Sequence, residues 1–544
     1  MGIYTKRAQS LVVILLLSAF YSTFSAGVSR AYAAGNSTPP GPDRFTSITV
    51  PYTHYKWWLL RWADSSILCT LEIDHEGSPT LGDVYYYCGE DIYDEWVEQP
   101  PCPPEIFLDD QSACPGYYIH LAGSTPAQRE VSVALPPPIV WVTLQDCIHQ
   151  STTNRCESPP TLVLTGDEPV SGERILRIEG NLDGDPFSCN SDLCEIPLPD
   201  TEDLGVPIQF WTYSSYGDSS LVFEAQVRVA LDETDPRDLA WYVDVLSSQW
   251  RGEPAASCAE SWEAFPAVGG PPKWLSTPED VTGLQTDFPY AYLAGQLIRQ
   301  GVVDIGNCLE NGLMQNGNAS TCGLNAAQPA ILEWQNHFDG QIMEAAEETQ
   351  ISAYLLKNLF ARESQFWPGV FNDGNDVGLG QLTTNGADTA FLWNPSFFEQ
   401  FCPFVLNGES CEKGYLHLDE YELARIRDAL VYSVNATCEN CSLGLNLTQA
   451  DLSVNVFAHT LLASCEQTGR VIELNTGDAF AGENSSYEDL WKFALVNYNA
   501  GPGCLGLAVF KTSQKGDPTD WEHVSSNLTP VCEGTRVYVE DISK

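Results

Sequence analysis

Basic residues are scarce in this sequence. Its 544 residues include 26 lysines and arginines against 73 aspartates and glutamates, a formal net charge of −47. Nucleic acids and anionic lipids are bound by surfaces rich in lysine and arginine, so the shortage excludes both as main partners. Long apolar stretches are also lacking, since no run approaches the roughly 20 residues that a bilayer span needs.

Several catalytic signatures are missing as well. The sequence has no G-x-S-x-G, no H-E-x-x-H and no P-loop, which mark serine hydrolases, zinc peptidases and nucleotide hydrolases. The eight histidines are scattered, and none is paired at the spacing of metal ligands. The sequence therefore predicts neither a metal site nor a cofactor.

The first 33 residues have the pattern of a secretory signal peptide. Lys6 and Arg7 precede the apolar stretch Leu11–Phe20, and Ala31-Tyr32-Ala33 fits a small-residue cleavage site. We therefore expect a secreted protein, extracellular or in the cell envelope, without a membrane span after cleavage. The full sequence is 43% hydrophobic and is long enough for about three or four folded domains.

All 18 cysteines follow this leader. An even number of cysteines in an exported chain indicates disulfides. Cys147/Cys156, Cys189/Cys194 and Cys402/Cys411 are close enough in sequence to predict loop staples, whereas the other pairings stay open. The C-x-x-C formed by Cys438 and Cys441 lacks the second ligand pair that a structural zinc site needs.

The residue pattern changes along the chain and predicts a multidomain protein. Short alternating runs cut by turn residues predict all-β, sandwich-like modules at the N-terminal side: a β-rich module over 45–135 and an immunoglobulin-like β-sandwich over 139–232. Residues 233–285 are interpreted as a connector held by a disulfide. From 286 to 544 the periodicity becomes helical, which predicts a mainly α domain.

Aromatic residues are concentrated in the first module, at Trp57, Trp58, Trp62 and the run Tyr85–Tyr87. Exposed aromatic faces bind sugar rings, and buried ones fill the cores of sandwiches. We favour a buried core for this group.

Glu363 stands out among the acidic residues. Ser352 is a good N-cap for a helix over 353–364, and Leu359 and Phe360 belong to its apolar face. Glu363 continues that face at the carboxyl end of the helix. Burial and the helix dipole both disfavour a charge there, so they raise the pKa of the carboxyl toward that of a general acid working near neutral pH.

Glu363 also begins the first of a series of motifs. The series resembles the lysozyme-like lytic transglycosylase (soluble lytic transglycosylase, SLT) family, in which E-S-x-F, G-L-x-Q-L, A-Y-N-A-G-P-G and T-R-x-Y-V follow in this order. The corresponding segments here are Glu363-Ser364-Gln365-Phe366, Gly378-Leu379-Gly380-Gln381-Leu382, Asn497-Tyr498-Asn499-Ala500-Gly501-Pro502-Gly503 and Thr535-Arg536-Val537-Tyr538-Val539.

The resemblance covers residues 329–542 and implies a lysozyme-like fold for the C-terminal domain. It implies cleavage of the β-1,4 bond between N-acetylmuramic acid and N-acetylglucosamine in peptidoglycan, with 1,6-anhydro products. Glu363 matches the catalytic acid/base of the family. Gln381, Tyr498 and Asn499 match cleft positions that hold substrate or orient the glutamate, and Ser364 matches a serine beside it. Protein partners are not indicated.

Three features depart from the family pattern. Residues 402–449 form an insertion with four cysteines, which we interpret as a lid or a cleft wall. Gly380 replaces a common methionine and so removes an apolar contact from the cleft. Asn497 replaces the usual small residue before Tyr498.

Two alternatives to transglycosylation stay open. Goose-type lysozymes, which are related in fold, carry a carboxylate near the position of Asp373, so this residue is a possible second carboxylate that positions water for hydrolysis. Asp376 is interpreted as part of a polar turn. The other alternative is a cell-surface protein that binds glycan without cleaving it.

Overall fold

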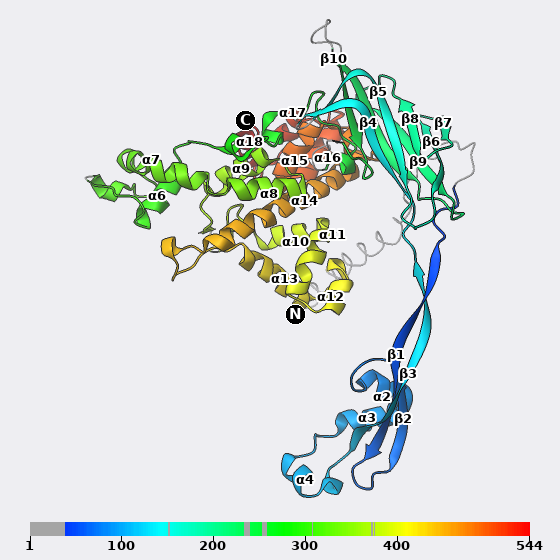
Figure 1. Ribbon diagram of the computed structural model, residues 1–544. Coiled ribbons are helices and arrows are strands. Elements are labelled where there is room, and N and C mark those ends of the chain that lie inside the picture. The colour runs from blue at the N-terminus through cyan, green and yellow to red at the C-terminus, as the bar shows by residue number, and fades with distance from the viewer. Residues whose placement is uncertain are drawn as a thin grey trace, which may run out of the picture.

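The computed structural model describes residues 39–544 except 151–152, 233–239, 253–257, 307, 372–373 and 375. The predicted signal peptide, residues 1–33, lies outside the described residues. Within them, a β-rich N-terminal and central part is followed by a helical C-terminal part (Figure 1). The predicted multidomain order, from β to α, is therefore confirmed at this level.

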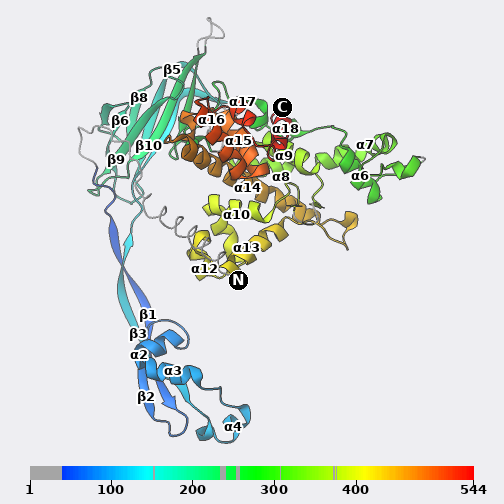
Figure 2. The same ribbon diagram turned by 180° about the vertical axis from the view of Figure 1, so that it is seen from behind.

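The N-terminal module is a long arm (Figures 1 and 2). Strands β1 (Phe45–Arg61) and β3 (Tyr117–Ala134) pair antiparallel along their whole length, and β2 (Ile67–Ile73) joins β1 near the far end. Three helices lie between β2 and β3, so the prediction of an all-β module was wrong here. Their segments are too short to show a clear helical period, and tertiary contacts determine whether so short a segment forms a helix or a strand. The helices are α2 (Leu81–Cys88), α3 (Glu90–Glu98) and α4 (Pro104–Asp109).

The second module is one curved eight-stranded sheet, a half-barrel, in the order β4-β5-β11-β10-β9-β6-β7 with β8 paired to β5. The predicted two-sheet sandwich was therefore wrong, because one-sided alternation looks the same in a sandwich and in a curved sheet. The sheet also extends past residue 232 into the predicted connector. Its strands are β4 (Ile139–Gln150), β5 (Thr153–Asp167), β6 (Ile175–Leu182), β7 (Asp185–Cys189), β8 (Leu193–Pro197), β9 (Val206–Ser214), β10 (Phe223–Asp232) and β11 (Ala240–Leu246).

The arm is anchored to the half-barrel by Arg44. This arginine is buried, and its guanidinium contacts Asp218 at 2.6 Å and Glu168 at 2.7 Å. It also donates a hydrogen bond to the carbonyl oxygen of Pro136, 3.1 Å away, so it connects both ends of the arm to the sheet. Because two carboxylates surround one cation, each buried charge has a partner.

The C-terminal part is an assembly of helices around α14 (Leu447–Thr476), which packs against α8, α10, α15 and α16. The predicted helix over 353–364 is confirmed as α9. The elements are α6 (Ala291–Arg299), α7 (Thr321–Gln335), α8 (Asp339–Thr349), α9 (Ala353–Ser364), β12 (Val370–Phe371), β13 (Asp376–Val377), α10 (Thr384–Trp393), α11 (Pro395–Phe401), α12 (Gly408–Glu412), α13 (Glu420–Ser433), α15 (Tyr487–Ala500), α16 (Pro502–Lys515), α17 (Trp521–Ser526) and α18 (Gly534–Ile542), after a short α5 (Ala259–Trp262).

Disulfides connect all 18 cysteines, each of which lies in the described part of the chain. The three predicted loop staples are confirmed, and Cys438 pairs with Cys441. Cys258 of the segment after β11 pairs with Cys465 of α14, across 207 residues. So many disulfides fit an extracellular protein. No helix among the described residues is long and apolar enough to cross a membrane.

Candidate active site

A cleft of about 760 Å³ opens in the helical part, beside the end of α9. Its walls come from β13, the turn before α10, α10 itself, α14 and the end of α15. Three carboxylates and several hydroxyl and amide groups face it, a lining suited to a polar ligand such as a sugar. The lining residues are Glu363, Asp376, Gln381, Leu382, Thr383, Asn385, Gly386, Asp388, Thr389, Thr460, Ser464, Asn497, Tyr498, Asn499, Ala500, Gly501 and Pro502.

Local sequence places Glu363 at this cleft. The Ser352 side chain accepts a hydrogen bond from the backbone N–H of Leu355 and so begins α9. The helix then buries Leu359 and Phe360. It ends at Gln365, whose φ of 47° is left-handed, and the chain turns away there. Glu363 is therefore held on the last turn of a buried helix, with its carboxyl group facing the cleft.

The surroundings of Glu363 favour its protonated form. Burial raises the pKa of Glu363 to about 7; the Tyr538 hydrogen bond and the Arg362 charge oppose this rise, and the Asp376 charge adds to it. The Tyr538 hydroxyl donates to Oε1 of Glu363 at 2.5 Å. A carboxyl with this pKa carries a proton in a substantial fraction of molecules near neutral pH, as a general acid requires.

Sequence reasoning assigned no role to Tyr538, although this residue lies in the T-R-x-Y-V segment. It is buried on α18, 175 residues after Glu363 along the chain. The same segment contributes Thr535, whose hydroxyl donates to Oδ1 of Asn499 at 2.9 Å. The motif was visible in the sequence, but no local pattern indicates which residue its tyrosine meets.

Gln381 holds the backbone of the glutamate. It lies in the turn before α10 with a φ of 55°, and its side-chain Nε2 donates to the carbonyl oxygen of Glu363. Helix α9 and the G-L-x-Q-L turn are thereby joined. Gln381 thus positions Glu363 and also lines the cleft.

Gly380 has a steric reason to be glycine. A Cβ atom there would lie 2.7 Å from the Tyr498 hydroxyl oxygen and closer still to the ring of Phe457. The Tyr498 hydroxyl donates to the carbonyl oxygen of Gly380 at 2.7 Å, which brings the two segments together. The ring of Phe457 therefore occupies the space that a larger residue at 380 would need.

The remaining predicted residues support the walls. Tyr498 and Asn499 line the cleft, but their described hydrogen bonds go to Gly380 and Thr535 and not to the Glu363 carboxyl. Ser364 is buried, and its hydroxyl donates to the carbonyl oxygen of Phe360 at 3.2 Å. Ser364 is thus placed in the helix end and not among the cleft residues.

A second carboxylate faces the cleft, at Asp376. Asp373, the predicted position for it, lies outside the described residues. Asp376 is the first residue of β13, lines the cleft and is close enough for its charge to raise the pKa of Glu363. The interpretation of Asp376 as part of a polar turn missed this position, because the fold of the β12–β13 hairpin decides where the side chain lies.

The insertion over 402–449 supplies none of the lining residues named above, but it contacts one of them, Asp388. Arg427 of α13 contacts Asp388 of α10 at 2.6 Å, and the Tyr415 hydroxyl also donates to Asp388. Asp388 lines the cleft, so the insertion determines how this carboxylate is held. The Cys402–Cys411 disulfide stabilises the start of this segment.

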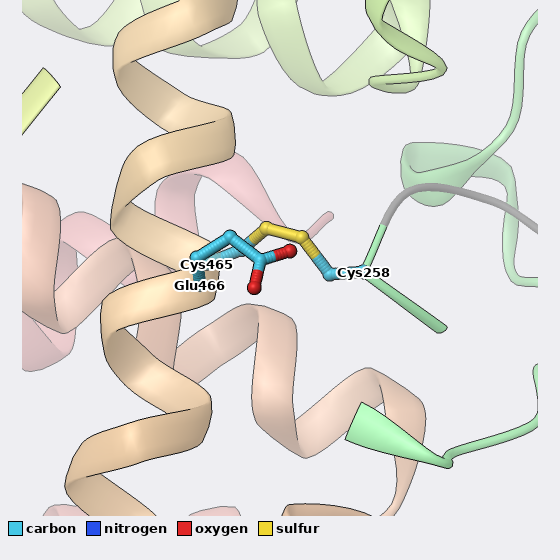
Figure 3. A group of neighbouring side chains, drawn as sticks. All are labelled: Cys258, Cys465 and Glu466. Atoms are coloured by element: carbon cyan, nitrogen blue, oxygen red, sulfur yellow. A yellow bond between two sulfur atoms is a disulfide. The ribbon is translucent and has the colours of Figure 1, made fainter. Parts of the chain in front are cut away.

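One group of described residues has the composition of a metal site. Cys258, Cys465 and Glu466 lie together, as Figure 3 shows. The two sulfur atoms are bonded to each other, so neither is a thiolate available to a metal. Glu466 instead accepts a hydrogen bond from the Ser261 hydroxyl at 2.8 Å, and burial raises its pKa. The group joins the connector to α14.

No protein-family model matches this chain, and a search of curated proteins found no significant match. The likeness to lytic transglycosylases therefore depends on the motifs themselves. The first two segments are close in sequence and the last two come much later, yet Gln381 and Tyr538 both hydrogen-bond to Glu363, and Tyr498 lines the same cleft.

Proposed function

We propose that this chain is a secreted lytic transglycosylase that cleaves the β-1,4 bond between N-acetylmuramic acid and N-acetylglucosamine in peptidoglycan. One observation carries the proposal: Glu363 lies in a cleft of about 760 Å³ with its pKa raised to about 7. Its carboxyl group accepts a hydrogen bond from Tyr538, and its backbone accepts one from Gln381. We also propose that the helical domain has the lysozyme-like fold.

In this mechanism Glu363 acts first as acid and then as base. Its protonated carboxyl gives a proton to the glycosidic oxygen as the bond from that oxygen to C1 breaks. The resulting carboxylate takes a proton from the 6-hydroxyl of the muramoyl residue, whose oxygen then bonds to C1. The 1,6-anhydro ring forms, and Glu363 regains its proton. Tyr538 stabilises the carboxylate between the two steps by donating its hydrogen bond.

Hydrolysis is a second candidate, and the position of Asp376 favours it. A carboxylate that shares the cleft with the acid is able to orient a water molecule toward C1. The sugar product would then have a reducing end. In this version Asp376 takes the part that the sequence suggested for Asp373.

Mass spectrometry of the soluble products from purified peptidoglycan tests both versions. Ends with a 1,6-anhydro ring support the transglycosylase, and ends heavier by one water support the hydrolase. Glu363→Gln should lower turnover by about a thousandfold or more and leave glycan binding intact. The matched control is Glu344→Gln, which changes an exposed glutamate of α8. If the folded, disulfide-intact protein binds glycan but releases no product, the chain is a glycan-binding protein and the proposal is wrong.

A further inference from the structure

The far end of the arm exposes aromatic side chains. Three consecutive tyrosines of α2 face solvent, with exposed fractions of 51% for Tyr85, 81% for Tyr86 and 42% for Tyr87. The expectation of a buried aromatic core was therefore wrong for these tyrosines. The Tyr86 and Tyr87 rings meet edge to face at 4.9 Å, and Tyr85 meets Tyr93 of α3 in the same way at 5.4 Å. We call these four residues the tyrosine cluster.

The exposure is built into the arm. Its small core consists of Leu59, Leu71, Ile73 and Val84, and none of the four tyrosines belongs to it. The Cys69–Cys88 disulfide ties the end of α2 to β2. The helix is thus held with its tyrosines outward. Rings held at a surface lose little conformational entropy on binding, which is why tyrosine is common in protein interfaces.

The segment that carries the cluster is acidic. Between Arg61 and Arg129 the sequence contains 13 aspartates and glutamates and not one lysine or arginine. Helix α3 alone carries Glu90, Asp91, Asp94, Glu95 and Glu98, all exposed. Within the described part of the chain, none of these five forms an ion pair with a basic residue. Glu95 accepts a hydrogen bond from the Tyr117 hydroxyl. Carboxylates without a cationic partner beside exposed rings form a surface complementary to cations.

We propose that the tyrosine cluster and the acidic helix α3 form a docking surface for a folded protein partner rich in surface lysine and arginine. The tyrosine rings would pack on the cationic side chains, and the carboxylates would pair with them. A second copy of this chain, with its charge of −47, would be repelled, as would an anionic membrane or wall polymer. A neutral glycan would use the rings but has no charge to match the carboxylates.

The position of this surface suits a partner that leaves the cleft free. The arm carries it well away from the helical part (Figures 1 and 2). Arg44 holds the root of the arm to the half-barrel through buried ion pairs. The docking surface does not depend on the proposed glycan-cleaving activity, and the two are tested separately.

The test uses the full chain with its disulfides intact and an arginine-rich peptide of about 12 residues as the probe, measured by calorimetry at low and high salt. Asp91→Asn/Asp94→Asn/Glu98→Gln should weaken binding by about tenfold at low salt and by less at high salt. Tyr86→Ala/Tyr87→Ala should weaken it by about fivefold at both salts, whereas Tyr86→Phe/Tyr87→Phe should keep most of the affinity.

A matched control removes three exposed carboxylates from the half-barrel, Asp185→Asn/Glu195→Gln/Glu202→Gln. It should leave affinity within about twofold of the original. An equal loss in this control would mean that only diffuse negative charge binds the peptide, and the proposal would be wrong. It would be wrong too if the original chain does not bind, if the alanine variant binds as well as the original, or if a neutral chito-oligosaccharide displaces the peptide.

Discussion

The arm and the helical part use the same kinds of residue in opposite ways. In the helical part Tyr538 is buried in a large core and hydrogen-bonds to Glu363, while Glu363 and Tyr498 are partly buried at the wall of the cleft. In the arm, tyrosines and glutamates lie at the surface of a module with few buried residues. Composition is therefore a poor guide to role: burial converts a carboxyl into a proton donor, and exposure leaves it a fixed negative charge.

The two regions also differ in how they are held. The helical part has a large continuous hydrophobic core, whereas the arm supplements its small core with two disulfides and with the buried ion pairs of Arg44. A substitution in one region should therefore change the stability of that region and leave the other region unchanged.

The largest expected effect is on the arm side, at Arg44. Arg44→Met leaves Glu168 and Asp218 buried without their cation and should cost about 3–5 kcal/mol of unfolding free energy in the half-barrel and the arm root. Urea unfolding combined with limited proteolysis of the arm measures this. Turnover of a soluble glycan should not change, because the cleft lies in the other region. Arg129→Met, at an exposed arginine of β3, is the matched control.

The pH dependence of the same contact has a definite sign. Arg44 lowers the pKa of Asp218 in the folded state, chiefly through its hydrogen bonds. A lowered folded pKa stabilises the protein above the ordinary pKa of the carboxyl, and this stabilisation is lost as the pH falls through the lowered value. In Arg44→Met that acid-side loss should disappear. If the unfolding free energy of Arg44→Met falls at acid pH as steeply as that of the original chain, the ion pair does not have this role.

A smaller effect is expected at Gly380 in the helical part. Gly380→Ala places a Cβ against Phe457 and the Tyr498 hydroxyl and should cost about 1–3 kcal/mol. It should also lower turnover, because Gln381 beside it holds the backbone of Glu363. Gly340→Ala on α8 is the control, since nothing lies near its Cβ, and it should be neutral or slightly stabilising. Equal stability of the two variants would show that the turn is free to move.

The smallest effect in free energy is expected at Tyr538. Tyr538→Phe removes the hydrogen bond that stabilises the Glu363 carboxylate, so the pKa of Glu363 should rise above about 7. Turnover should fall by about tenfold, and the alkaline limb of the profile of kcat/KM against pH should move to higher pH. Tyr354→Phe is the control, because the Tyr354 hydroxyl donates to the carbonyl oxygen of Gly283 and not to a cleft residue; it should leave the profile unchanged. A fall in turnover without a shift of this limb would mean that Tyr538 acts only through packing.

The sequence by itself determined the features that depend on near neighbours along the chain. The periodicity of 353–364 placed α9 and put Glu363 at its end, because residues three and four apart share a helix face. Close cysteine pairs became loop staples, since short separations leave few other partners. The change from strand to helix along the chain was likewise a local property.

Tertiary structure decided what depends on contacts between distant segments. Tyr538 meets Glu363 across 175 residues, and Cys258 meets Cys465 across 207. An alternating pattern does not say whether the strands form one curved sheet or two stacked sheets, because a strand buries one face in both arrangements. Nor does an aromatic run say whether a core covers it, and the exposed Tyr86 follows from the size of the arm's core. Burial depends on how the whole chain packs, and therefore the raised pKa of Glu363 and the exposure of the arm's tyrosines depend on it too.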